Sequence, residues 1–210
     1  ENYDGEILRV AANSPTKFNV FDIDMSFSED GKDAVALKSE SIMTIVETAK
    51  GMRLTSDERS VVDRCVRDAY RDYIASDCQD EWKLPTLTTF YELLLQQPED
   101  LAKYLALVLE LYVKGSFRSF AEKTNINTSK KFLVLDIFDL GDQLRAVGLQ
   151  VILEYIWQRV ISNKKRGIRT WVWIDEFAVM FNDSDSSGEM QSGKFFVKVY
   201  SRIRKHGGVV

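Results

Sequence analysis

The chain has 210 residues, 45% of them hydrophobic and 29% charged, and its net charge is −4. This length is enough for one core-forming domain with a smaller subdomain. The composition is that of an ordinary globular protein, and the net charge gives no overall case for binding to nucleic acid or membranes. No apolar stretch reaches the roughly 18 residues of a membrane span, and we expect no secretory leader.

Charge distribution and cysteine spacing narrow the classes of partner and site. Residues 159–210 carry ten Lys and Arg against five Asp and Glu, a net charge of +5, which leaves −9 for residues 1–158. Solvated helix faces explain this basic end better than a nucleic-acid track does. Cys65 and Cys78 lack metal-ligand spacing, so we expect free thiols rather than a disulfide or a metal site.

The first half of the sequence predicts a strand and then a block of helices. Residues 6–10 alternate as a strand does, and residues 18–25 bring apolar side chains back to the core. Residues 34–114 have helical periodicity. We expect four helices in this block, over residues 34–50, 55–75, 85–97 and 99–113. Residues 1–33 therefore form the N-terminal part of the main domain, and residues 34–114 form an all-α insertion with its own small core.

The second half of the sequence predicts a βαβ unit. Residues 132–137 form an apolar strand, residues 142–163 a long helix that ends in the basic turn NKKRG, and residues 170–174 a second apolar strand. Short apolar strands joined by a helix are expected to be parallel, central and buried on both faces. A helix over residues 193–206 and the start of another strand follow. Residues 115–210 are therefore predicted to hold most of an α/β domain.

Two adjacent carboxylates, Asp175 and Glu176, directly follow the second apolar strand of this unit. In α/β sheets, ligands bind beside the carboxyl ends of the strands. The pattern matches the Walker B position of P-loop NTPases, where the first acid holds Mg²⁺, usually through water, and the second orients or deprotonates the attacking water. The alternative is a solvated turn whose acids suit the positive end of the next helix. The surrounding sequence favours the first interpretation.

That surrounding sequence resembles a family of ATPases. The segment KFLVLDIFDLGDQLRAVGLQVILEYIWQRVISNKKRGIRTWVWIDEFAVMF is similar to the C-terminal ATPase domain of conjugation and type IV secretion motors of the VirB4/TraC type, within the FtsK/HerA superfamily of P-loop ATPases. The flanking stretches KGSFRSFAEKTNIN and KVYSRIRKHGG are similar as well. The resemblance extends over most of the chain, including the helical insertion. It implies an α/β fold: a partial RecA-like P-loop NTPase sheet with an all-α insertion.

The sequence departs from that family in one respect. No G-x-x-x-x-G-K-[ST] motif occurs among its eleven glycines, although the family places one before the segment that EILRVAANSPTKFNVFDID resembles. The chain therefore looks like a piece that begins after the phosphate-binding loop and stops inside a strand. Because the amides, Lys and Ser/Thr of that loop grip phosphates and Mg²⁺, we expect no ATP hydrolysis by this polypeptide alone, while the resemblance implies it for the parent protein.

The resemblance implies roles for four residues. Asp175 would hold the water shell of Mg²⁺ in bound Mg-ATP, and Glu176 would polarise the attacking water. Ring ATPases of this kind use an arginine from the neighbouring subunit to stabilise charge on the transferred phosphoryl group. Arg204 is the first choice for that arginine and Arg202 the second. The alternative for both is a basic helix face that suits the C-terminal end of the helix.

The resemblance also implies partners and a location. The parent protein would form a hexameric homo-oligomeric ring that binds ATP and works in the cytoplasm, at the inner face of the membrane, through other type IV secretion components. One alternative is a HerA/FtsK-like DNA translocase, which would bind DNA through the basic C-terminal segment. Another is a non-catalytic scaffold domain of the same fold.

The remaining conspicuous side chains have structural explanations. His206 is the only histidine and is expected at a helix end, so a His-based metal site or a Ser-His-Asp triad is excluded. Trp171 and Trp173 alternate on the predicted strand. This favours core or interface positions over a platform for stacking bases.

Overall fold

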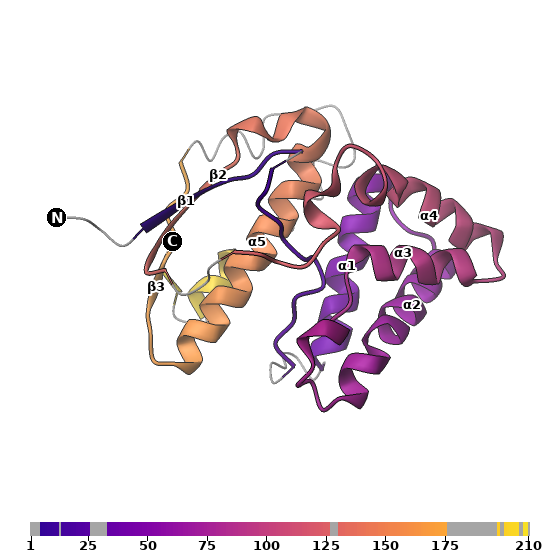
Figure 1. The fold of residues 1–210 in the computed structure, drawn as a ribbon, viewed down its shortest axis with the longest axis horizontal. Coiled ribbons are helices and arrows are strands. Elements are labelled where there is room, and N and C mark those ends of the chain that lie inside the picture. Colours follow the sequence, from indigo (N-terminus) through magenta and orange to yellow (C-terminus); the bar gives the residue numbers. More distant parts are fainter. Residues whose placement is uncertain are drawn as a thin grey trace.

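The computed structural model describes residues 5–12, 14–25, 33–126, 130–175, 197, 200–205 and 208–209. Figure 1 shows a long central helix, α5 (Gly141–Lys165), with helices α1–α4 gathered on one side of it and the strands on the other. The predicted α/β class is consistent with this arrangement of helices and small parallel sheets. No helix in these ranges combines the length and hydropathy needed to cross a membrane.

Four strands form two parallel pairs. Strand β1 (Gly5–Arg9) pairs with β2 (Phe132–Asp136), with Gly5 opposite Phe132 and Arg9 opposite Asp136. Strand β3 (Thr170–Trp171) pairs with β4 (Gly208–Val209), and the Val172 amide extends this ladder by donating to the Val209 carbonyl at 2.7 Å. Both pairs are parallel, but neither of them joins the two strands of the predicted βαβ unit, β2 and β3.

The prediction that the strands of the βαβ unit are central and buried on both faces is wrong. Within the described ranges β2 and β3 belong to separate two-stranded sheets. Phe132 is 58% exposed, and Trp171 and Trp173 are 60% and 85% exposed, so the two tryptophans are not core residues either. Leu135 of β2 packs against the main core and Val172 against the smaller core beside α5, but the opposite faces lie open. An apolar run predicts a strand without showing which of its faces is covered.

The helical block forms as predicted, because strong local signals stand at its helix ends. Asp33 caps α1 by accepting from the Ala36 amide at 2.7 Å, and Gly51 ends that helix with φ of 72°. Thr55 and Glu58 form a reciprocal capping box at the start of α2. The helices of this block are α1 (Ala34–Lys50), α2 (Ser56–Ala75), α3 (Leu87–Gln96) and α4 (Asp100–Val113). Single 3₁₀ turns lie at η1 (Glu81–Lys83), η2 (Arg118–Phe120) and η3 (Phe138–Leu140).

Replacing Thr55 by alanine is expected to lower the free energy of unfolding by about 1 kcal/mol, because it removes the acceptor for the Glu58 amide. Urea unfolding followed by circular dichroism measures this loss. The matched control is Ser60→Ala on the exposed side of the same helix, where the hydroxyl only donates to the Ser56 carbonyl. If Thr55→Ala costs no more than this control, the cap does not stabilise α2.

One hydrophobic core connects the helical block with the rest of the domain. Phe21 is fully buried, with its ring centroid 5.9 Å from that of Tyr70 on α2 and 5.7 Å from that of Phe90 on α3. The same cluster includes Val10 before the block and Val151 on α5. The interior of α1–α4 is therefore completed by side chains from outside residues 34–114.

The segments that lead into and out of the helical block are tied together by polar contacts. The Ser119 hydroxyl lies 2.8 Å from the Ala11 carbonyl oxygen. The Asn19 amide donates to the Thr124 hydroxyl oxygen at 2.8 Å, and the Lys17 amide donates to the Asn125 side chain at the same distance. These contacts join residues about 105 positions apart in sequence and fix the base of the helical block to the domain.

Both cysteines are free thiols, as predicted. Cys65 lies inside the α-helical core, and burial raises its pKa to about 11. Because the thiolate is the reactive form, Cys65 is an inert packing residue at neutral pH.

Candidate functional site

Asp175 lies at the carboxyl end of the parallel pair β3 and β4. Side chains alternate along the segment before it: Val172 and Ile174 pack against the core beside α5, whereas Trp173 is turned outward. Asp175 follows in the same outward series and is exposed. Glu176 lies outside the described residues, so its predicted role stays a prediction.

No group of three or more His, Cys, Asp or Glu side chains among the described residues could hold a metal ion, so a carboxylate such as Asp175 would contribute to a magnesium site only together with a substrate. Mg²⁺ keeps several of its waters and is usually bound through one or two carboxylates plus phosphate oxygens, rather than in a cage of protein ligands. An exposed carboxylate at the carboxyl end of parallel strands supplies one such hard oxygen ligand. Asp175 is the residue here that would hold the hydrated ion.

The carboxyl end of the other strand pair also carries charged side chains. Arg9 ends β1, and its Nε atom lies 3.8 Å from Asp136, the last residue of β2, and 3.6 Å from Asp139 in the following turn. These carboxylates therefore have a cation from within the chain. Both strand pairs present acids at their carboxyl ends, as expected for the ligand-binding edge of an α/β fold.

Arg202 and Arg204, the two predicted arginines, differ in their surroundings. Residues 200–205 are helical, and Ile203 between the two arginines is buried against Trp157 and Val160 of α5. Arg204 is exposed, whereas Arg202 is half-buried, and its positive charge contributes to the lowered pKa of Glu154 on α5. The two arginines therefore differ in exposure, which their positions in the sequence do not reveal.

Glu154 is the centre of a buried polar junction. Lys38 of α1 donates to Glu154 Oε1 at 2.7 Å and also to the Val20 carbonyl oxygen at 3.3 Å. Gln158, one turn further along α5, donates to the same carboxylate at 3.2 Å. Burial raises the pKa of Glu154, but the charge and hydrogen bond of Lys38, the hydrogen bond of Gln158 and the charge of Arg202 outweigh it and lower this pKa. Glu154 is therefore ionised at neutral pH.

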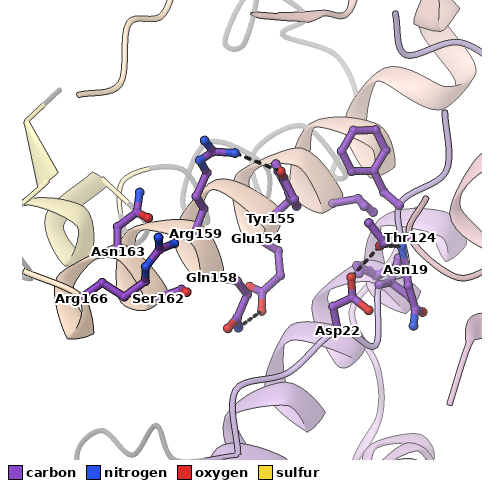
Figure 2. A pocket seen from close by; sticks show the side chains of 14 residues that line it. Asn19, Asp22, Thr124, Glu154, Tyr155, Gln158, Arg159, Ser162, Asn163 and Arg166 are labelled. Atoms are coloured by element: carbon purple, nitrogen blue, oxygen red, sulfur yellow. Dashed lines mark hydrogen bonds between the residues drawn. The ribbon is translucent and has the colours of Figure 1, made fainter. Parts of the chain in front are cut away.

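A cavity of about 210 Å³ opens beside this junction, between α5, residues 18–22 and Thr124. Figure 2 shows Glu154 and Gln158 projecting from α5 toward the side of the cavity where Asp22 lies, and Arg159 and Tyr155 projecting the other way. Asp22 accepts a hydrogen bond from the Thr124 hydroxyl at 2.5 Å, and burial raises the pKa of its carboxyl group. The cavity thus combines an apolar wall with charged groups of both signs.

The Lys38–Glu154 junction is not among the predicted sites, although the sequence carries a signal for it. Lys38 occupies a buried position of α1 between Val35 and Ile42, at the spacing of a helix face. Glu154 likewise follows Val147 and Val151 on the buried side of α5. A charged residue among the apolar residues of a helix face is expected to be buried and to need a partner of opposite charge. Two helices that each carry one such residue, with opposite charges, are therefore candidates for a buried ion pair.

The fold resembles that of a solved protein. No described protein family matches the sequence, and no curated protein does. The structure is similar to that of VirB4 of Thermoanaerobacter pseudethanolicus, with a TM-score of 0.73 and 19% sequence identity. The match covers 98% of this chain and 78% of that chain, so both the helical block and the strand pairs fall within it. The predicted likeness to the VirB4/TraC type is confirmed at the level of the fold: this chain folds as VirB4 does.

Proposed function

We propose that these residues form the ATP-hydrolysing edge of a motor that powers transfer through a type IV secretion system. The observation that carries the proposal is the place of Asp175, an exposed carboxylate at the carboxyl end of parallel strands in a fold similar to that of VirB4. The sequence around Asp175 supports it, because the resemblance to the VirB4/TraC type rests on residues on both sides of this position.

The proposed division of labour follows the chemistry of phosphoryl transfer. Asp175 would hold the water shell of Mg²⁺, which would neutralise charge on the phosphates of bound ATP, and Glu176 would orient and deprotonate the attacking water. Residues 1–210 contain no G-x-x-x-x-G-K-[ST] motif. We therefore assign the grip on the phosphates to a loop outside these residues, and we expect the 210-residue polypeptide to lack turnover by itself.

The arginines take different roles in this proposal. Arg204 is exposed and available to a neighbouring subunit, whereas Arg202 is half-buried. We therefore assign to Arg204 the stabilisation of the transferred phosphoryl group in a neighbouring site of a ring.

Mg²⁺-dependent ATP hydrolysis by the full-length protein tests this function. We expect phosphate release that requires Mg²⁺ and rises more steeply than linearly with protein concentration, because the active sites form between subunits. The 210-residue polypeptide is the matched control and is expected to release no phosphate. A full-length protein that assembles and binds no nucleotide would contradict the motor and favour a scaffold. Salt-sensitive DNA binding that stimulates turnover would instead indicate a DNA translocase.

A further inference from the structure

Helix α4 is apolar on its outer side as well as on its inner side. The residues of its inner side are buried in the main core: Ala102, Leu105, Ala106, Leu109, Tyr112 and Val113. On the other side, Tyr104, Leu107 and Leu111 are 48%, 66% and 45% exposed. Their spacing of three and four residues places these three side chains in one line along the helix, which we call the α4 stripe.

Helix α2 shows how a solvated helix of the same block is built. Between Asp57 and Asp72 every exposed position of α2 is charged or polar. Residues 104–109 of α4, YLALVL, are by contrast all apolar. A helix that is apolar on all sides is normally buried on all sides. The middle of α4 therefore has the composition of a helix that packs against a second partner on its outer side.

Charged side chains accompany the α4 stripe in a regular order. Asp100 and Lys114 lie seven residues before and seven residues after Leu107. Lys103 lies four residues before Leu107, and Glu110 lies three residues after it. All four charged residues are exposed. Each charge on one side of Leu107 therefore has a charge of opposite sign at an equal or nearly equal distance on the other side.

This order of charges is complementary to itself when the helix direction is reversed. If a second α4 packs antiparallel with Leu107 against Leu107, Asp100 comes level with Lys114 of the second copy. Lys103 comes within about 1.5 Å, measured along the axis, of Glu110 of the second copy. A two-fold axis generates each of these pairs twice. A partner with charges of one sign would instead be repelled at half of these positions, so the pattern favours a second copy of this chain.

The charged groups can exchange partners easily, because their contacts within the chain are weak. Lys103 Nζ lies 3.1 Å from Asp100, whose side chain is fully exposed. Glu110 lies 3.5 Å from the Tyr91 hydroxyl, and Lys114 Nζ lies 4.9 Å above the ring of the same tyrosine. Exposed contacts of this kind contribute little to stability, so an approaching second copy can replace them.

We propose that the α4 stripe is a dimerisation surface, at which the α4 helices of two copies of this chain pack antiparallel about a two-fold axis at Leu107. The apolar stripe forms the centre of this contact, and the charged pairs form its rim. Figure 1 shows α4 and the strands on opposite sides of α5. The contact is therefore separate from the strand edge that the proposed function places between ring subunits, and it does not rest on that function.

Disulfide cross-linking of the full-length protein tests the axis. Two cysteines form a disulfide only when their Cα atoms lie within about 7 Å of each other. Leu107→Cys, combined with Cys78→Ser to remove the partly exposed native thiol, is therefore expected to give a cross-linked dimer under mild oxidation. Lys103→Cys in the same background is the matched control, because its two copies would lie about 12 Å apart along the axes. Equal cross-linking at both positions, or none at position 107, overturns the proposal.

Charge reversal tests the rim. In Lys103→Glu alone and in Glu110→Lys alone, like charges meet twice across the axis, so self-association is expected to weaken by at least about tenfold. An equimolar mixture of these two variants has opposite charges at each of these meetings and is expected to form heterodimers as tightly as the wild type. Native mass spectrometry measures both results.

Arg71→Glu is the control for charge reversal, since Arg71 is exposed on α2 of the same block, and it is expected to leave self-association unchanged. Single variants that associate as well as the wild type, or a mixture that does not associate, overturn the proposal.

Leu107→Asp tests the stripe independently of ring assembly. It places a second acid against its own copy at the axis, and it leaves the core untouched because Leu107 is exposed. The mass of the assembly in sedimentation velocity is expected to halve, from two chains to one or from two rings to one. A folded variant with an unchanged mass overturns the proposal. Absence of ATP hydrolysis by the wild type would refute the proposed function and leave this expectation in place.

Discussion

Replacing Glu176 by glutamine is expected to abolish ATP turnover by the full-length protein while leaving nucleotide binding intact. The carboxamide keeps the size of the side chain but cannot accept a proton from the attacking water. Loss of such a general base costs about 10²- to 10⁴-fold in rate. Asp175 remains in place to hold the hydrated Mg²⁺, so the affinity for Mg-ATP is expected to change little.

Phosphate release and titration with a fluorescent nucleotide measure the two parts of this prediction. Glu92→Gln, at an exposed position of α3, is the matched control for the loss of one negative charge and is expected to keep wild-type turnover. Turnover retained by Glu176→Gln would refute the role of Glu176, and with it the Walker B interpretation of the Asp-Glu pair.

Arg204→Ala is expected to reduce turnover by about 10³-fold or more, because an arginine supplied to the transferring phosphoryl group is worth about that much in rate. Lys205→Ala removes an exposed positive charge from the next position of the same helix and is expected to have little effect. Equal losses in the two variants would indicate a general effect of basic charge on this helix.

A mixing experiment asks whether Arg204 acts across a subunit interface. Arg204→Ala subunits keep Glu176, and Glu176→Gln subunits keep Arg204, so a mixed ring contains some interfaces with both groups intact. Turnover is therefore expected to return when the two inactive variants are mixed. No recovery would show that Arg204 acts within its own subunit or not at all, and recovery with Arg202→Ala in its place would reverse the assignment of the two arginines.

The helices could be predicted because their signals are local. The helix expected over residues 34–50 coincides with α1, whose ends depend on Asp33 and Gly51 beside it. The helix expected over residues 142–163 extends instead from Gly141 to Lys165. The basic turn predicts an end there, but lysines favour the last turn of a helix as much as the residues after it.

The environment of the strands could not be predicted in the same way. The apolar run over residues 170–174 predicts a strand, and only Thr170–Trp171 pair as one, with the next amide continuing the ladder. A hydrophobic strand face favours burial, but the sequence does not show which segment, if any, packs against it. The exposed faces of Phe132, Trp171 and Trp173 are therefore a property of the assembled fold rather than of any local pattern.

In the candidate site too, local features could be predicted and long-range contacts could not. Asp175 could be found because an acid directly after an apolar strand is a contiguous pattern, whereas the meeting of Lys38 with Glu154 joins residues 116 positions apart. Pairing of that kind depends on how α1 packs against α5, and a single sequence does not record this packing. The different exposure of Arg202 and Arg204 likewise depends on how Ile203 packs against α5.

The shared core has a mechanical consequence. Val10, Phe18 and Phe21 complete the interior of α1–α4. Deleting the block of helices would therefore expose these three side chains to water. Among the described residues, the block and the segment that follows β1 share one continuous core through these side chains. We therefore expect a displacement of the helices to be transmitted through that core to β1 and to β2 beside it.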